Sequence, residues 1–309
     1  MKYKHLFGPV PSRRLGVSLG IDLVPHKTCT LDCVYCECGK TTNRTFERRE
    51  YAPLDEILEE LKNYMNENSE IDYITFSGSG EPTLHSGIGE IINFLKHNYP
   101  QYKVAVLTNG TLFYGKKLRD EVKSADLIIP SLDAASCEIF NKINRPYEKL
   151  NLDKIINGLI ALRKEFSGEI WLEIFIVPGL NDAGLELQKI KNIIEEINPD
   201  KVQLNTLHRP GTENWVMPAK REEMERIARF LKAEVIAEFK TKKKIKGFSK
   251  DTKDTILSIL KRRPCTAGDL SGISGIHPNE LNKYLRLLVK TGEIYMEPLA
   301  GGIFYKAGK

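Results

Sequence analysis

The sequence contains few cysteines and no long apolar run. Six of its 309 residues are cysteine, and three of these fall between Cys29 and Cys36. Secreted disulfide frameworks use regularly spaced cysteine pairs, so this pattern instead favours metal binding in a reducing compartment. Residues 1–5 contain no apolar signal sequence, and no run of about 18 apolar residues occurs. We therefore expect a soluble, cytoplasmic protein that makes no contact with a membrane.

The sequence also lacks a recognisable Ser/His/Asp arrangement, and its six histidines are scattered. We expect each histidine to be structural. Hydrophobic residues make up 41% of the chain, which is enough for a sizeable core, and no segment is of low complexity. The length fits one large α/β domain with a small appendage.

The basic residues are concentrated towards the C-terminal end. Residues 240–309 contain 15 Lys and Arg against 6 Asp and Glu, whereas the whole chain has a net charge of only +5. The rest of the chain is therefore mildly acidic. A basic tail on an acidic body predicts a polyanionic partner for the tail, the alternative being a solvated linker.

Three cysteines with the spacing C-x3-C-x2-C form the most specific motif, Cys29-Thr-Leu-Asp-Cys33-Val-Tyr-Cys36. Three thiolates can bind three irons of one [4Fe–4S] cluster and leave the fourth iron open to a substrate or cofactor. A zinc site usually takes four ligands in two pairs, and unrelated buried thiols are the other alternative. We interpret Cys29, Cys33 and Cys36 as cluster ligands.

Strand and helix patterns alternate over most of the chain. Predicted strands lie at residues 17–24, 72–76, 103–107, 126–129, 169–177 and 201–206. Predicted helices lie at residues 53–66, 88–97, 113–122, 152–166, 185–197 and 219–231. Residues 7–16 are predicted to be a turn-rich approach segment, and residues 235–239 a short extra strand. Six strands alternating with helices predict parallel, right-handed βα units. The chain is too short for eight such units, so we predict a partial barrel of six strands.

Glycine and polar residues follow the carboxyl ends of the predicted strands. They form the clusters 77–83, 108–110 and 131–133. In parallel α/β barrels this rim carries the active site, so the clusters should converge on one mouth. Glu173 and Asn205 are polar residues within apolar strands, and burying either without a partner would cost a few kcal/mol. We interpret both as facing the mouth, the alternative being solvent exposure.

The pattern changes beyond residue 250. Helices are predicted at 252–262, 267–270 and 279–290, followed by a hairpin of strands 293–297 and 302–306. This order resembles a winged helix–turn–helix domain. The predicted organisation is thus a barrel at 1–239, a basic linker at 240–249 and a winged-helix-like domain at 250–309.

One face of the last predicted helix is basic. Lys283, Arg286 and Lys290 recur at i, i+3 and i+7, which suits a nucleic-acid groove or phosphate backbone. The alternatives are a solvated face on a protein-docking module and a purely structural helix.

The cysteine motif, with Tyr35 before its last cysteine, resembles the signature of the radical S-adenosylmethionine (radical SAM) superfamily. The turn Ser77-Gly-Ser-Gly-Glu-Pro-Thr83 resembles its glycine–glutamate motif, although family members often have Gly at the position of Ser79. The resemblance implies a partial (β/α)6 barrel, a [4Fe–4S] cluster and SAM as cofactors, and an electron donor such as flavodoxin or ferredoxin. The implied SAM contacts are Tyr35, Gly78, Ser79, Gly80, Glu81, Asn109, Ser131, Asp133 and Asn205. For Ser131 and Asp133 the alternative is a turn-capping role.

Residues 7–16 and 173–182 resemble a branch related to wyosine-type tRNA-modifying enzymes, and the resemblance covers roughly residues 1–235. Those enzymes build a second cluster from upstream cysteines, but residues 1–28 contain none. The spare cysteines are Cys38, Cys137 and Cys265. The resemblance therefore implies the general class but not the imidazoline-forming reaction.

Arg13 and Arg14 lie just ahead of the first predicted parallel strand. With Glu173 they are candidate contacts to a substrate phosphate or carboxylate, or a surface pair. The leading hypothesis is a radical SAM enzyme that acts on tRNA or another RNA. The others are a protein-radical activase or peptide modifier, and a redox-sensing DNA-binding regulator.

Overall fold

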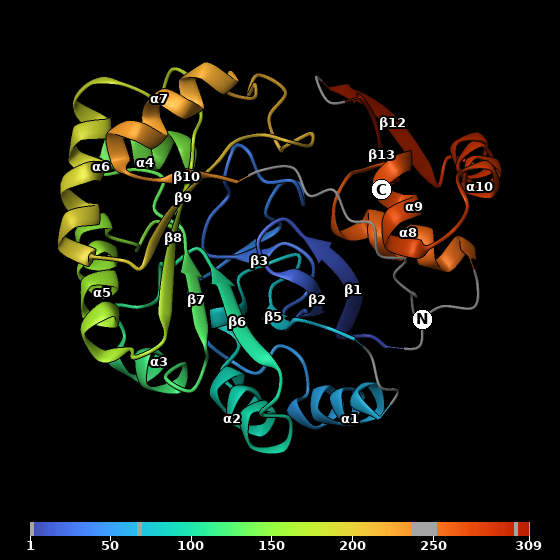
Figure 1. Ribbon diagram of the computed structural model, residues 1–309, viewed down its shortest axis with the longest axis horizontal. Coiled ribbons are helices and arrows are strands. Elements are labelled where there is room, and N and C mark those ends of the chain that lie inside the picture. The colour runs from blue at the N-terminus through green and yellow to red at the C-terminus, as the bar shows by residue number, and fades with distance from the viewer. Residues whose placement is uncertain (1–2, 67–69, 237–251, 300–301, 309) are drawn as a thin grey trace.

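The computed structural model describes residues 3–66, 70–236, 252–299 and 302–308. Its main feature is an eight-stranded sheet with the order β1-β2-β5-β6-β7-β8-β9-β10 (Figure 1). The strands are β1 (Leu6–Ser12), β2 (Gly16–Ile21), β5 (Tyr73–Phe76), β6 (Lys103–Thr108), β7 (Leu127–Pro130), β8 (Glu169–Phe175), β9 (Lys201–Asn205) and β10 (Glu234–Val235). All neighbours pair in parallel except β1 and β2. The six predicted strands form the centre of this sheet, so the predicted α/β class and partial barrel are confirmed.

Helices cover the outer face of the sheet (Figure 1). They are α1 (Leu54–Met65), α2 (Ile88–Asn98), α3 (Lys116–Glu121), α4 (Cys137–Ile143), α5 (Leu152–Glu165), α6 (Gly184–Ile197) and α7 (Arg221–Leu231). Alternation along each strand sorts the side chains: Val104 and Val106 pack into the helix-facing core, whereas Ala105 and Leu107 face inwards. Polar inward-facing residues are thereby directed to the interior of the barrel.

The predicted approach segment at 7–16 is mostly strand, so that prediction is wrong. β1 pairs antiparallel with β2 at the edge of the sheet, with an irregularity between Phe7 and Val10. An edge strand tolerates Pro9 and Pro11, which a central strand would not. The short helix α4 was not predicted either, because its 7 residues, about two turns, carry little periodic signal.

The remaining elements form a separate small unit: α8 (Thr252–Arg262), β11 (Cys265–Thr266), α9 (Ala267–Ser274), α10 (Pro278–Lys290), β12 (Ile294–Leu299) and β13 (Gly302–Ala307). They share one apolar cluster that includes Ile256, Leu270 and Leu285. The order of helices followed by a hairpin is as expected, and its identity as a winged helix stays a prediction. The predicted basic linker, 240–249, lies outside the described residues.

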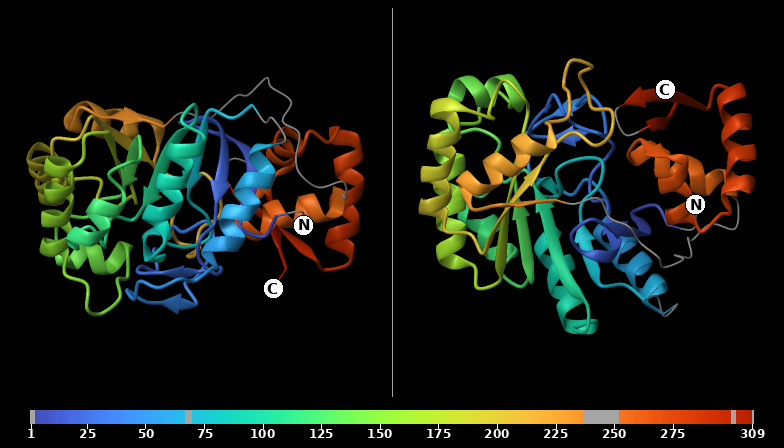
Figure 2. Two further views of the ribbon diagram at one scale, coloured as in Figure 1. Left: turned by 90° about the horizontal axis from the view of Figure 1, so that it is seen from below. Right: turned by 45° about the horizontal axis from the view of Figure 1, so that its top comes forward.

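This C-terminal unit lies beside the β1 edge of the sheet in both views of Figure 2, and α9 contacts β1. It faces the open side of the barrel, which the outer helices leave uncovered (Figure 1). None of the helices in the described ranges is both long and apolar enough to cross a bilayer.

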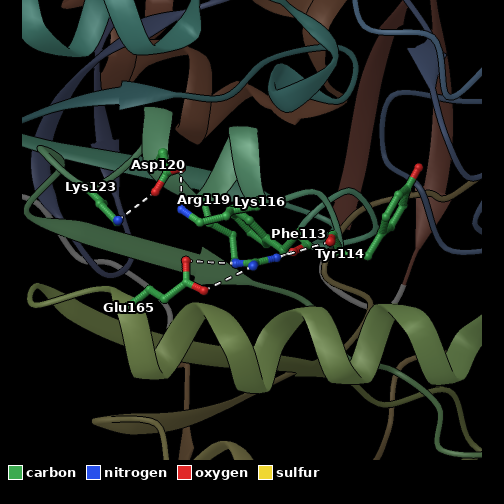
Figure 3. Close-up of polar contacts among 7 residues, drawn as sticks. All are labelled: Phe113, Tyr114, Lys116, Arg119, Asp120, Lys123 and Glu165. Atoms are coloured by element: carbon green, nitrogen blue, oxygen red, sulfur yellow. Dashed lines mark hydrogen bonds and ion pairs between the residues drawn. The ribbon is translucent and has the colours of Figure 1, made fainter.

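A buried arginine anchors the loop that follows β6 (Figure 3). Arg119 on α3 donates to the carbonyl oxygens of Phe113 at 2.7 Å and Tyr114 at 3.1 Å. Its Nε and Nη2 each lie 3.1 Å from a different carboxylate oxygen of Glu165 on α5. Gly158 on α5 allows this approach, because a Cβ there would lie 2.5 Å from the Tyr114 backbone nitrogen. The loop is thereby fixed against the outer helices.

Candidate functional site

The cysteine motif lies in the loop that leaves β2. Its first residues form the strand β3 (Thr28–Cys29), which pairs with β4 (Asn43–Arg44). The backbone N–H groups of Asp32 and Val34 donate at 2.9 Å to the carbonyl oxygens of Asn144 and Ile143, at the end of α4. The loop is therefore held by backbone hydrogen bonds on two sides. None of Cys29, Cys33 and Cys36 is in a disulfide.

Each of these three sulfurs has its own N–H donor. Asn109 Nδ2 lies 3.5 Å from Cys29 Sγ, and Asn144 Nδ2 lies 3.4 Å from Cys33 Sγ. Lys27 Nζ lies 3.0 Å from Cys36 Sγ. Donors of this kind stabilise thiolates and raise the reduction potential of an iron–sulfur cluster. The three cysteines are thus equipped as thiolate ligands.

The sequence analysis found Asn109 but missed Lys27 and Asn144. Lys27 adjoins the motif and has a left-handed backbone with φ of 57°, which no sequence signal indicates. Asn144 is 111 residues from its sulfur partner and reaches it only because α4 folds back on the loop.

The pKa values of the thiols diverge. Burial raises the pKa of Cys29 to about 12, and burial also raises that of Cys33, helped by the nearby charges of Asp133 and the other two cysteines. A hydrogen bond from the Cys38 thiol, together with Lys27, lowers the pKa of Cys36 to about 5. Although desolvation opposes it, the Cys36 charge raises the pKa of Lys27.

Within the described part of the chain, no three His, Cys, Asp or Glu side chains converge on one point where a single metal ion could bind. In a [4Fe–4S] cluster each thiolate binds a different iron, so the sulfurs need not share one ion. Three cysteines on one loop, each with a separate N–H donor, fit such a cluster.

The glycine turn after β5 is joined to the cysteine loop by backbone hydrogen bonds. Lys27 N donates to Ser79 O at 2.9 Å, and Glu81 N donates to Thr28 O at 3.0 Å. A Cβ at Gly80 would lie 2.2 Å from Thr28 O, so only glycine permits this approach. Gly78 has φ of 150° and packs against the carboxylate of Asp22. The turn is therefore set directly beside the cysteines.

Both carboxylate oxygens of Glu81 accept hydrogen bonds from neighbouring residues. Its Oε1 accepts from Thr83 N, Thr83 Oγ1 and Thr108 Oγ1 at 3.0, 2.6 and 2.6 Å, and its Oε2 accepts from Asn109 N at 2.8 Å. Burial raises the pKa of Glu81, while these hydrogen bonds oppose the rise. The side chain thus fixes Asn109, which in turn donates to Thr30 Oγ1 at 2.7 Å and to Cys29. Glu81 acts as a positioning residue.

Tyr35 and Asp133 form a second buried polar pair. The Tyr35 ring stacks on Phe175 at 3.7 Å between centroids, and its hydroxyl donates to Asp133 Oδ2 at 2.5 Å. Asp133 also accepts from Asn144 Nδ2 at 2.7 Å and Phe175 N at 2.9 Å. Burial raises the pKa of Asp133 to about 6. Tyr35, Asn109, Ser131 and Asp133 line one small cavity of about 20 Å³, so the structure brings these four predicted residues together.

The interior-facing residues of β8 and β9 have cationic partners. Glu173 forms an ion pair with Arg14, and Asn205 Oδ1 accepts from Arg13 Nη1 at 3.3 Å. Asn205 is 8% exposed, so it is not a solvent-facing residue. The hairpin between β1 and β2 thus places both arginines inside the barrel.

The predicted basic face on α10 is separate from this site. Lys283, Arg286 and Lys290 are exposed, and Leu281, Leu285 and Leu288 are buried. Figure 1 places α10 on the side of the C-terminal unit that faces away from the sheet. The structure therefore does not bring these residues to the cysteine loop.

Comparison with known proteins gives one family match and several relatives. The model of the radical SAM superfamily matches residues 23–188, which is more than half of the chain. A protein of Brachyspira hyodysenteriae described as GTPase Obg is 38% identical over 99% of this chain, which spans 45% of that relative's length. A UPF0026 protein of Methanocaldococcus jannaschii is 34% identical over 97% of this chain and 94% of its own. A solved structure of TYW1 with a lysine-pyruvate adduct bound is similar in fold, with a TM-score of 0.52, 17% identity, and 73% and 75% of the two chains covered.

Proposed function

Because this chain belongs to the radical SAM superfamily, we propose that it holds a [4Fe–4S] cluster through Cys29, Cys33 and Cys36 and cleaves SAM. Members of the superfamily use both cofactors. When bound, the reduced cluster supplies the electron that splits SAM into methionine and a 5′-deoxyadenosyl radical, which takes hydrogen from the substrate. The proposed electron donor is a flavodoxin or a ferredoxin.

The chain's own residues position the reaction. Lys27, Asn109 and Asn144 direct N–H groups at the three sulfurs, which favours the reduced cluster. The turn Gly78–Glu81 presents backbone groups beside the cysteine loop, where SAM is proposed to bind. Tyr35 and Asp133, joined by one buried hydrogen bond, line a small cavity together with Asn109.

One observation carries this proposal: three cysteines on one loop, each with its own donor, joined by backbone hydrogen bonds to a glycine turn. The test is anaerobic reconstitution with iron and sulfide, followed by dithionite reduction and assay of SAM cleavage. We expect a [4Fe–4S] EPR signal and 5′-deoxyadenosine. Cys33→Ala should abolish the product, whereas Cys137→Ala, which removes an exposed thiol on α4, should retain it.

A reconstituted cluster that forms no 5′-deoxyadenosine would contradict the proposed reaction. It would favour the redox-sensing, DNA-binding regulator. A zinc-loaded protein with no iron would contradict the proposed cluster as well.

We further propose an RNA substrate, supported by the exposed face of α10. The three cations Lys283, Arg286 and Lys290 lie on the side of α10 opposite its buried leucines. The test is tRNA binding at several salt concentrations. Replacing all three by Gln should weaken binding and reduce the salt slope by about 2–3, since each phosphate contact contributes nearly one unit.

A matched control replaces three exposed lysines of the outer helices α5 and α6, at Lys154, Lys164 and Lys189. This control should leave tRNA binding unchanged. Absent or salt-insensitive binding by the unmodified protein would contradict an RNA substrate and favour a protein-radical activase or peptide modifier.

A further inference from the structure

A cavity of about 290 Å³ lies between the barrel and α8 of the C-terminal unit. Ser77, Gly78 and Cys38 line its barrel end, and Ser258, Arg262 and Arg263 line its other end. Its volume is at the lower end of that of small-molecule sites, which run from roughly 300 to 1,000 Å³. The cavity therefore has room for a small molecule or a group of about nucleotide size, next to the proposed SAM site.

Two arginines of the cavity have no carboxylate partner among the residues that the structure describes. No ion pair joins the guanidinium of Arg262 or Arg263 to any residue that the structure describes. Burial lowers the pKa of Arg262, and its Nε is a buried nitrogen with no hydrogen-bond partner in the structure. A desolvated cation with an unused donor is costly unless a ligand compensates it.

Arg262 is nevertheless held in a defined orientation. Its Nη1 donates to Ser258 Oγ at 2.9 Å and to Ser258 O at 3.1 Å, and its Cζ lies 4.8 Å from the centroid of the Phe7 ring. These contacts use Nη1 and leave Nη2, whereas Nε has almost no accessible surface and is not presented to the cavity. One guanidinium donor of Arg262 is therefore left for an oxygen of a carboxylate or phosphate.

The acidic groups near the cavity have partners of their own. Glu37 accepts from Arg209 at 3.3 Å, and Asp254 also has a partner. The charge of Asp22 acts on Arg262, but the hydrogen bonds of the Asp22 carboxylate come from Ser79 N at 3.3 Å and Ser79 Oγ at 2.8 Å. The positive charge of the arginine pair is therefore not balanced by direct contact with a carboxylate in the described ranges.

The C-terminal unit is part of the cavity wall and not an independent appendage. Cys38, two residues after the last motif cysteine, places its Sγ 3.0 Å from the carbonyl oxygen of Arg262. Arg209 connects Glu37 at 3.3 Å with Asp269 on α9 at 3.8 Å. These contacts hold the arginine-bearing end of α8 against the cysteine loop.

We propose that this cavity binds the substrate through a phosphate or carboxylate group held by Arg262 and Arg263. The proposal rests on the proposed function, because it places the substrate beside SAM, and it goes further by assigning the group that is recognised. The C-terminal unit then contributes directly to substrate binding, independently of the basic face on α10.

The test uses the full-length, cluster-reconstituted protein saturated with SAM. Isothermal titration calorimetry measures the binding of inorganic phosphate, uridine monophosphate, uridine and acetate. We expect the monophosphate or the acetate to bind and uridine not to bind. Tighter binding of uridine monophosphate than of acetate would identify a phosphate-bearing substrate. Tighter binding of acetate would identify a carboxylate-bearing substrate.

Two substitutions and one control locate the anion. Arg262→Gln and Arg263→Gln should each weaken its binding at least tenfold. Arg263→Gln removes a side chain without a hydrogen-bond partner in the described chain, so the fold should persist even if Arg262→Gln loosens α8. Arg229→Gln, an equal charge change at an exposed position of α7, should have no effect.

Three results would overturn the inference: no anion binding, an affinity in both cavity variants equal to that of the unmodified protein, or displacement of SAM by the anion. An assay of 5′-deoxyadenosine on the same samples separates the two proposals. If the unmodified protein forms 5′-deoxyadenosine but the variants bind the anion normally, the cavity assignment fails and the proposed function stands. If the unmodified protein forms none, the proposed function fails whatever the anion does.

Discussion

The ammonium nitrogen of Lys27 lies 3.0 Å from the sulfur of Cys36, although most of the Lys27 side chain is buried. A positive charge in this position stabilises the reduced, more negative form of a cluster relative to the oxidised form. Desolvation strengthens the effect, because the pair is shielded from bulk water. The loop that carries the proposed cysteine ligands therefore also carries a positive charge that would raise the reduction potential of the cluster.

Replacing this lysine should make the cluster harder to reduce. Lys27→Gln is expected to shift the reduction potential to more negative values by tens of millivolts, where 59 mV corresponds to about a factor of ten for one electron. EPR-monitored redox titration measures the shift. Lys40→Gln, which changes an exposed lysine of the same loop, is the matched control and should leave the potential unchanged. Equal potentials in both variants would show that the Lys27 charge does not reach the cluster.

A methyl group at Gly80 should prevent the glycine turn from approaching the cysteine loop. Its Cβ would lie 2.2 Å from the carbonyl oxygen of Thr28, and a backbone atom cannot easily move away. Gly80→Ala is therefore expected to lower the iron content of the reconstituted protein severalfold. Gly115→Ala, whose Cβ would lie 3.5 Å from Leu112 O, should bind iron normally. Iron and sulfide analysis measures both, and full occupancy in Gly80→Ala would contradict the proposed packing.

The central sheet could be predicted because the periodic signal is strong there. Strands such as β6, Lys103–Thr108, read as short apolar runs followed by glycine and polar residues. β1 was missed because its glycine and two prolines indicate turns, and only its pairing with β2 at the edge of the sheet makes it a strand. Local sequence patterns do not reveal which segment will pair with the edge strand of a sheet.

The candidate site was predicted in outline for the same reason. The cysteine spacing and the glycine turn are local, so the sequence carries them. The contact of Asn144 with Cys33 and that of Cys38 with Arg262 join residues 111 and 224 positions apart, and nothing in one sequence indicates either. The cavity between the barrel and α8 likewise arises from tertiary packing alone.

Arg119 should be needed for the stability of the loop that follows β6. Arg119→Ala would leave the buried carbonyl oxygen of Phe113 without its donor, which costs about 1–3 kcal/mol. We expect the melting temperature to fall by several degrees. Lys116→Ala, which removes an exposed charge of the same helix (Figure 3), should have little effect because surface ion pairs contribute little. Differential scanning calorimetry of both variants makes the comparison, and equal melting temperatures would contradict the anchoring role.

His85 is buried in its neutral form, which should make stability depend on pH. Its Nε2 lies 2.8 Å from the carbonyl oxygen of Ala52, and its Nδ1 lies 3.0 Å from the N–H of Gly87. Nε2 must therefore donate while Nδ1 accepts. Protonating Nδ1 would turn the second contact into a clash of two donors. Burial lowers the pKa of His85 below its ordinary value, in agreement with this geometry.

The sign of the pH dependence follows from the protons bound in each state. Below about pH 6.5 His85 becomes protonated in the unfolded chain but stays neutral in the folded chain, because its pKa is lowered there. The free energy of unfolding therefore falls as the pH falls. His85→Gln keeps a donor for Ala52 but does not titrate. Compared with the unmodified protein, this variant should show a shallower loss of melting temperature between pH 7.5 and pH 5.5. His97→Gln, at an exposed position of α2, should retain the original slope. Parallel slopes in all three proteins would mean that His85 is protonated in the folded state, and the assigned hydrogen bonds would be wrong.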